Sequence, residues 1–136
     1  MATEDDAAPA REAVARLTIY SEMCSAEELA ARVGLEPDEK WNKGDRNERG
    51  RPITTTAISY LSSAPVEAAP ADHVADLVAR VEPFAGRFIA EREAGSSVRM
   101  KLALFEDTDN VMFTLPADLL AQIGSLGLEL EFDIYP

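Results

Sequence analysis

The sequence contains a single cysteine, Cys24, and a single histidine, His73, among its 136 residues. One cysteine can form no intramolecular disulfide and cannot supply a four-cysteine zinc site. One histidine excludes metal sites that require several imidazole ligands. We therefore expect a fold that is stabilised by packing, in a chain long enough to bury its own core, with no cofactor and no metal.

Long apolar runs are also missing, although 46% of the residues are hydrophobic. No run approaches the roughly 20 residues that a membrane-spanning helix needs. The first ten residues are acidic and rich in alanine, without the basic and apolar regions of a secretory signal peptide. We expect a cytoplasmic protein that does not bind membranes, with a flexible acidic segment at 1–12 and a single α+β domain at 13–136.

Basic residues are few, with 13 Lys and Arg against 25 Asp and Glu, and the formal net charge is −12. A surface of this sign repels phosphate backbones, which disfavours nucleic-acid binding. It also speeds the encounter with a basic protein. The same charge serves solubility, so it does not identify a partner by itself.

Two local patterns define the first elements. Apolar residues alternate with polar ones through Leu17 and Ile19, which predicts a strand over about 14–20 with one buried face. Ser25 and Glu28 have the spacing of a capping box, and Gly34 can adopt the left-handed conformation that ends a helix. The sequence therefore predicts a helix over 26–33.

The middle of the chain combines breakers with regular patterns. Residues 35–52 hold two prolines and two glycines among many charges, which indicates a loop with a ragged strand near Trp41. Residues 53–62 are rich in β-branched and aromatic residues, as in a strand. An amphipathic helix is predicted from Ala71, with a break near Glu82 caused by Pro83 and a second piece that ends at Gly95.

The last third predicts a hairpin, a short helix and a strand. The alternating run 98–105, the turn residues 107–110 and the run 111–115 together indicate a β-hairpin. Pro116 suits the first turn of a helix that continues to Ile123. In the final strand we expect one buried row and one solvated row, and these are respectively Leu128, Leu130, Phe132 and Ile134, and Glu129, Glu131, Asp133 and Tyr135.

This order of elements favours an α+β fold of two layers, with helices packed on one face of a mixed, mainly antiparallel sheet. Four stretches also carry a family resemblance: residues 25–37, the Trp-Asn-Lys-Gly-Asp run at 41–45, the strand near Ile58 and the ending 126–135. Together they resemble the bacterial domain-of-unknown-function family 4279 over about residues 14–135. The resemblance implies no known activity, so it assigns no functional residue.

Cys24 is the best candidate for a nucleophile, because it lies just before a helix start, where the helix dipole can activate a thiol. The only histidine that could assist it, His73, lies in the first turn of another predicted helix. The alternative is a packed, inert cysteine. With no nucleophile-elbow motif present either, we expect no enzyme and name no catalytic residue.

A basic loop lies within the acidic chain. Five of the 13 basic residues fall between Lys40 and Arg51, with only two acidic residues among them. The candidate anion-binding or partner-binding set is Lys40, Trp41, Lys43, Arg46, Arg49 and Arg51. The glycines at 44 and 50 do not form a P-loop, because no Lys-Ser or Lys-Thr follows them. A solvated loop is the alternative interpretation.

An acidic row ends the chain. Glu129, Glu131 and Asp133 alternate along the last strand, with neighbours about 7 Å apart. Asp107 and Asp109 add two further carboxylates for a hard-metal site, but the glycine and the terminal glutamate of a calcium loop are missing. One interpretation of the row is a solvated acidic face, and the other is a docking surface for a basic protein.

Two functional hypotheses follow. The first is a small acidic protein-binding module, an immunity-type or accessory protein that occludes a basic partner through Glu129, Glu131 and Asp133. The second is a protein that binds a small anion or phospho-ligand through the basic loop at 40–51.

Overall fold

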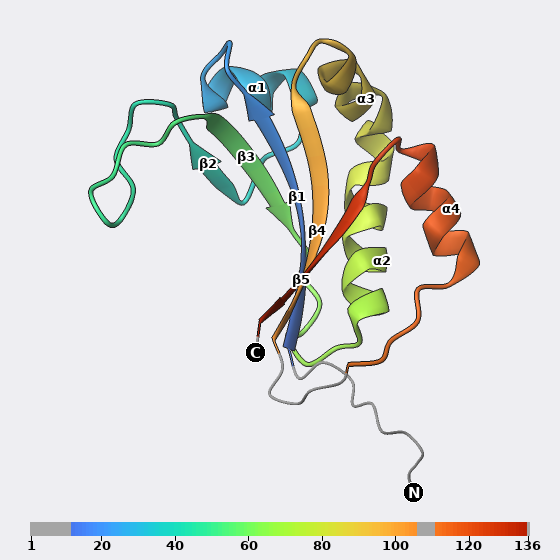
Figure 1. The fold of residues 1–136 in the computed structure, drawn as a ribbon. Coiled ribbons are helices and arrows are strands. Elements are labelled where there is room, and N and C mark those ends of the chain that lie inside the picture. Colours follow the sequence, from blue (N-terminus) through green and yellow to red (C-terminus); the bar gives the residue numbers. More distant parts are fainter. Residues whose placement is uncertain (1–11, 106–110, 136) are drawn as a thin grey trace, which may run out of the picture.

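The computed structural model describes residues 12–105 and 111–135, which form one layer of helices against one sheet (Figure 1). The expected flexible segment at 1–12 therefore lies outside the described residues, except for Glu12, which begins the first strand. The elements in chain order are β1 (Glu12–Ser21), α1 (Ala26–Val33), β2 (Glu39–Trp41), β3 (Thr56–Leu61), α2 (Pro70–Val81), η1 (Glu82–Phe84), α3 (Ala85–Glu93), β4 (Ser97–Phe105), α4 (Ala117–Ser125) and β5 (Leu130–Tyr135).

The sheet has the strand order β2-β3-β1-β4-β5. Every pairing is antiparallel except that of β4 with β5, which is parallel. Figure 1 shows α2, α3 and α4 on the same side of this sheet, with α1 at its upper end. The predicted α+β fold, with helices on one face of a mixed, mainly antiparallel sheet, is confirmed.

The core lies between the helices and this face of the sheet. Alternate residues of β1 from Ala13 to Ile19 are buried, as are alternate residues of β4 from Val98 to Leu104. From the helices, Leu29 of α1 and Leu77 of α2 complete the same cluster. The period-two pattern of the sequence therefore identified the buried face of both strands.

The predicted helix boundaries hold where capping chemistry defines them. Ser25 accepts the backbone N–H of Glu28, and the Glu28 side chain accepts the N–H of Ser25, which is the reciprocal arrangement of a capping box. Gly34 ends α1 with φ +83°, a conformation that residues with a Cβ rarely adopt. Pro83 breaks the next helix as predicted, since the 3₁₀ turn η1 separates α2 from α3.

The predicted hairpin is wrong. Residues 112–116 have no regular secondary structure, and β4 pairs instead with β1 and β5. The predicted turn at 107–110 lies outside the described residues. Val111, Phe113 and Leu115 pack their side chains against the core. Val111 forms only an isolated β-bridge and residues 112–116 belong to no strand, so this apolar run is a packed connection. The place beside β4 is taken by β5, which returns parallel to β4 after α4.

The predicted burial of the last strand is wrong in part. Leu130 packs against the core, but Phe132 is 49% and Ile134 56% exposed. Both share the helix-side face with Leu102 and Leu104, their register partners on β4. They are exposed because β5 is the outermost strand in the described part of the sheet and α4 packs on α2.

No helix in the described residues is both long enough and apolar enough to cross a membrane.

Candidate functional site

The acidic row of β5 lies on the open face of the sheet, which is the face turned away from the helices. Glu131 and Asp133 are in register with Lys101 and Ala103 of β4. The Lys101 ammonium lies 3.7 Å from Asp133 Oδ2, and Tyr135 donates its hydroxyl hydrogen to the same oxygen at 2.6 Å. This hydrogen bond raises the pKa of the Tyr135 phenol. Glu129 precedes the strand and is exposed.

Large apolar side chains surround this acidic row. On the open face, the rings of Phe105 and Tyr135 stack with their centroids 4.9 Å apart, and both rings are partly exposed. On the opposite face, Phe132 touches Phe113, with ring centroids 5.7 Å apart, and Ile134 is exposed beside it. Single exposed apolar residues are ordinary, but clustered ones mark interaction surfaces. Strand β5 thus exposes apolar groups on both faces.

The residues of the basic loop do not converge on one site. Lys40 and Lys43 lie at its base, paired with Glu36 at 3.8 Å and with Glu22 at 3.1 Å. Trp41 belongs to β2 and lines a hollow on the open face.

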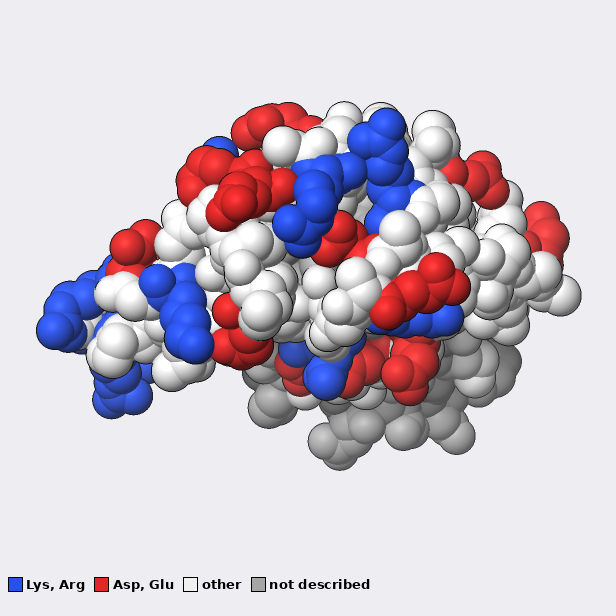
Figure 2. Space-filling view, turned by 90° about the horizontal axis from the view of Figure 1, so that it is seen from above, with Lys and Arg blue, Asp and Glu red and all other residues white. Residues whose placement is uncertain are grey.

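Arg46, Arg49 and Arg51 lie in the projecting part of the loop, where Figure 2 shows basic side chains gathered at one end of the molecule. The Arg46 guanidinium donates to the carbonyl of Gly50 at 2.6 Å. The Asn47 side-chain oxygen accepts the backbone N–H groups of Arg49 and Arg51. Arg49 and Arg51 line one shallow hollow of about 330 Å³ and make no ion pair within the described residues.

Cys24 and His73 lie at opposite ends of β1. The Cys24 thiol is half-buried and lies 3.5 Å from Ser21 Oγ, at the end of that strand. The His73 ring is buried and contacts Ser62, which bonds to Ala15 near the start of the strand. The structure therefore does not bring the two together as a catalytic pair.

In the two described ranges, no three His, Cys, Asp or Glu residues are grouped so that they could hold a metal; Asp107 and Asp109 lie outside those ranges.

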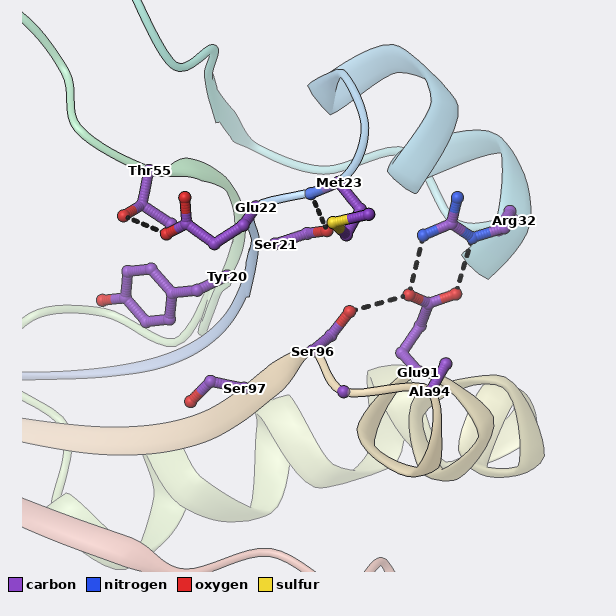
Figure 3. A pocket seen from close by; sticks show the side chains of 11 residues that line it. Tyr20, Ser21, Glu22, Met23, Arg32, Thr55, Glu91, Ala94, Ser96 and Ser97 are labelled. Carbon is purple, nitrogen blue, oxygen red and sulfur yellow. Dashed lines mark hydrogen bonds and ion pairs between the residues drawn. The ribbon is translucent and has the colours of Figure 1, made fainter.

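A pocket of about 600 Å³ opens at the upper end of the sheet, and we call it the hydroxyl pocket (Figure 3). It lies between the end of β1, helix α1, the end of α3 and the start of β4. Its side-chain hydroxyls come from Tyr20, Ser21, Thr55, Ser96 and Ser97. Sequence reasoning missed this site, because its lining comes from separate segments and matches no motif.

One wall of the hydroxyl pocket is an ion pair between two helices. The Arg32 guanidinium donates to both carboxylate oxygens of Glu91, at 2.8 and 2.9 Å, and Ser96 donates to the same carboxylate at 3.1 Å (Figure 3). The hydrogen bonds from Arg32 hold the pKa of Glu91 below its usual range and raise the pKa of Arg32. Arg32 also donates to the Cys24 sulfur at 3.4 Å.

The opposite wall carries a second paired carboxylate. Glu22 accepts hydrogen bonds from the Lys43 ammonium at 3.1 Å and from the Thr55 hydroxyl at 2.9 Å. These bonds, that of Lys43 first, lower the pKa of Glu22. Both carboxylates of the pocket are therefore ionised and already matched by a cation.

Comparison with protein families gives a match over residues 11–136 to the family described as Domain of unknown function (DUF4279). The match confirms the resemblance that the sequence motifs indicated. The search of curated proteins found no match. The search of solved structures found no match either.

Proposed function

Because the chain belongs to the DUF4279 family, whose description names no activity, we propose from geometry and charge that it is a protein-binding module. It docks a basic partner along β5 and acts by occluding that partner, as an immunity-type or accessory protein does. The observation that carries this proposal is the exposure of β5 side chains on both faces of the sheet, together with its place as the outermost strand among the described residues.

The side chains of β5 define the chemistry of the partner. Glu131 and Asp133 project on the open face, while Phe132 and Ile134 project on the helix-side face. The outer edge of β5, with which no described strand pairs, also offers backbone donors and acceptors to an incoming strand. A segment that alternates basic and apolar residues satisfies all three features at once.

Charge argues against a second copy of the same chain as the occupant of this edge. If two copies paired antiparallel about Phe132, the Glu131 of each would face the Asp133 of the other. Like charges directly opposite each other destabilise a strand pair, and each copy carries a net charge of −12. A basic partner turns the same charges into attraction and gains a faster association rate.

The test uses three tagged baits in lysate of the source cell. One is the unaltered protein, one carries Glu129→Lys, Glu131→Lys and Asp133→Lys, and the control carries Glu67→Lys, Glu82→Lys and Glu93→Lys. The two variants have the same net charge, and the control sites are exposed and outside β5. We expect a basic protein that the unaltered bait and the control retain at low salt, and that the β5 variant loses. Equal retention by all three baits, or equal loss in both variants, would contradict docking at β5.

Binding of a small anion by the basic loop is the second candidate function. Its support is the Asn47 turn, which sets Arg49 and Arg51 around one hollow, with Arg46 bonded to the Gly50 carbonyl of the same loop and Lys43 at the base of the loop. Isothermal titration with phosphate, nucleotides and sugar phosphates tests it. Heat that disappears in the Arg49→Gln, Arg51→Gln double variant supports it, and no heat from any of these ligands rejects it.

A further inference from the structure

Three hollows adjoin one another at the upper end of the sheet. The hydroxyl pocket, a hollow of about 270 Å³ that Trp41 lines and a hollow of about 280 Å³ that Arg99 lines all share Tyr20 and Thr55. The Tyr20 side chain is 40% exposed and lies at this junction. The hydroxyl pocket alone, with about 600 Å³, has the volume of a small-molecule site, which is typically about 300–1,000 Å³.

The charges that line these hollows are almost all matched within the described structure. Glu91 pairs with Arg32, Glu22 with Lys43 and Arg16 with Glu39. Arg99 is the exception, and its guanidinium donates to Ser97 Oγ at 3.1 Å. In the hydroxyl pocket itself, which Arg99 does not line, a strongly charged ligand would lose its hydration and find the opposite charges already engaged.

The hydroxyl groups, in contrast, keep unused capacity. Ser21 Oγ accepts from the Met23 backbone and the Cys24 thiol, and Ser97 Oγ accepts from Arg99, so both serines still have a hydrogen to donate. Ser96 donates to Glu91 and keeps lone pairs that can accept. An apolar ligand would leave these groups unpaired, which costs free energy, whereas a ligand rich in hydroxyls can both donate and accept.

We propose that the hydroxyl pocket binds a neutral, polyhydroxylated small molecule of the size of a mono- or disaccharide. The C–H face of the sugar lies against the Tyr20 ring, and its hydroxyls bond to Ser21, Ser96 and Ser97. The Arg32–Glu91 pair holds the wall between α1 and α3 in place, so the site is formed before the ligand arrives. This site is separate from β5 and does not depend on the proposed protein partner.

The experiment follows backbone amide NMR shifts of the isotope-labelled protein during titration. The neutral probes are glucose, galactose, mannose, maltose and sucrose, and the charged counterparts are glucosamine, glucuronate and glucose 6-phosphate. We expect saturable shifts at residues 20–23, 55 and 94–97 with at least one neutral sugar, and an affinity that ionic strength does not change. Salt independence separates this site from β5, where binding depends on charge.

Variants place the ligand within the pocket. Tyr20→Ala is expected to weaken the affinity at least about tenfold, and Ser97→Ala several-fold, while Tyr135→Ala, which alters an exposed tyrosine on the distant strand β5, leaves it unchanged. The spectrum of each variant reports whether the fold is intact. The proposal is overturned if no neutral sugar gives saturable shifts at these residues, if a charged counterpart binds more tightly than its neutral parent, or if both pocket variants bind as the unaltered protein does.

Discussion

Arg32 of α1 and Glu91 of α3 lie 59 positions apart in the sequence, and their side chains meet through two hydrogen bonds of 2.8 and 2.9 Å. The Glu91 side chain is only 8% exposed, whereas that of Arg32 is 47% exposed. The pair fixes two helices against each other at the edge of the hydroxyl pocket. It is therefore a structural element of that pocket as well as a link between distant segments.

Replacing Glu91 with glutamine should destabilise the fold. Glutamine keeps the shape but removes the charge, so the Arg32 guanidinium loses its partner and one amide group replaces an acceptor in a nearly buried place. We expect the free energy of unfolding to fall by about 1–3 kcal/mol, measured by urea denaturation. Glu93→Gln changes an exposed residue of the same helix and should alter the value by less than about 0.5 kcal/mol. Equal effects of the two variants would show that the ion pair contributes nothing specific.

Acid should destabilise the protein through the same carboxylate. The hydrogen bonds from Arg32 lower the pKa of Glu91, and the hydrogen bond from Arg80, 2.6 Å long, lowers the pKa of Asp38. A lowered pKa in the folded state means that the stabilisation is complete above the unfolded-state pKa, which is about 4.3 for glutamate and 3.9 for aspartate. It is lost as the pH falls through the lower folded-state values.

We therefore expect the free energy of unfolding to decrease as the pH falls below about 5. The decrease should be shallower in Glu91→Gln, because one of the linked carboxylates is absent. Urea denaturation at several pH values between about 3 and about 7 measures both curves. Curves of the same slope for the variant and the unaltered protein would mean that Glu91 does not contribute to acid unfolding.

The sequence predicted those helices and strands whose position is determined by residues only a few places apart. The alternation through Leu17 and Ile19 identified the buried face of β1, and Ser25, Glu28 and Gly34 defined both ends of α1. Pro83 marked the break between α2 and α3. In each of these cases, a backbone constraint or a short-range hydrogen bond decides the structure, so the sequence carries the information locally.

The features that the sequence did not predict depend on contacts between segments that lie far apart in the chain. Val111 to Leu115 alternate as a strand does, but the edge of β4 is taken by β5, which a local pattern cannot reveal. The exposure of Phe132 depends on how far the helix layer extends, not on the period of the strand. The hydroxyl pocket depends on segments that only the fold brings together, among them Tyr20, Thr55 and Glu91.

The core under α2 should not tolerate a charge. Leu77 is fully buried on the face that the helical periodicity predicted. We expect Leu77→Asp to abolish folding and Leu77→Ala to cost about 2–5 kcal/mol, because it leaves a cavity. Leu120→Asp changes an exposed leucine of α4 and serves as the control, which should remain folded. Thermal unfolding followed by circular dichroism measures all three, and a cooperative, near-native transition for Leu77→Asp would refute the packing of α2.

Ser62 links the central strand β1 to the only histidine, and removing its hydroxyl should destabilise the fold. Ser62 Oγ accepts the backbone N–H of Ala15 at 2.9 Å and lies 2.7 Å from Nδ1 of the buried His73 ring. The Ser62 hydroxyl has one hydrogen and two lone pairs, so it can accept from Ala15 and still bond to Nδ1 in either tautomer of the ring. The Nε2 atom has no hydrogen-bond partner among the described residues, so the Ser62 contact is the one that satisfies this ring.

Ser62→Ala leaves both the Ala15 N–H and His73 Nδ1 without that partner, and we expect a loss of about 1–3 kcal/mol in the free energy of unfolding. Ser63→Ala is the matched control, since Ser63 is exposed and its hydroxyl donates to the carboxylate of the partly exposed Asp76 at 3.1 Å. Its loss should cost less than about 0.5 kcal/mol. Urea denaturation of the two variants side by side tests the difference. If Ser62→Ala is no more destabilising than its neighbour, the buried imidazole must find its stabilisation in packing, because the hydrogen bond then contributes no net free energy.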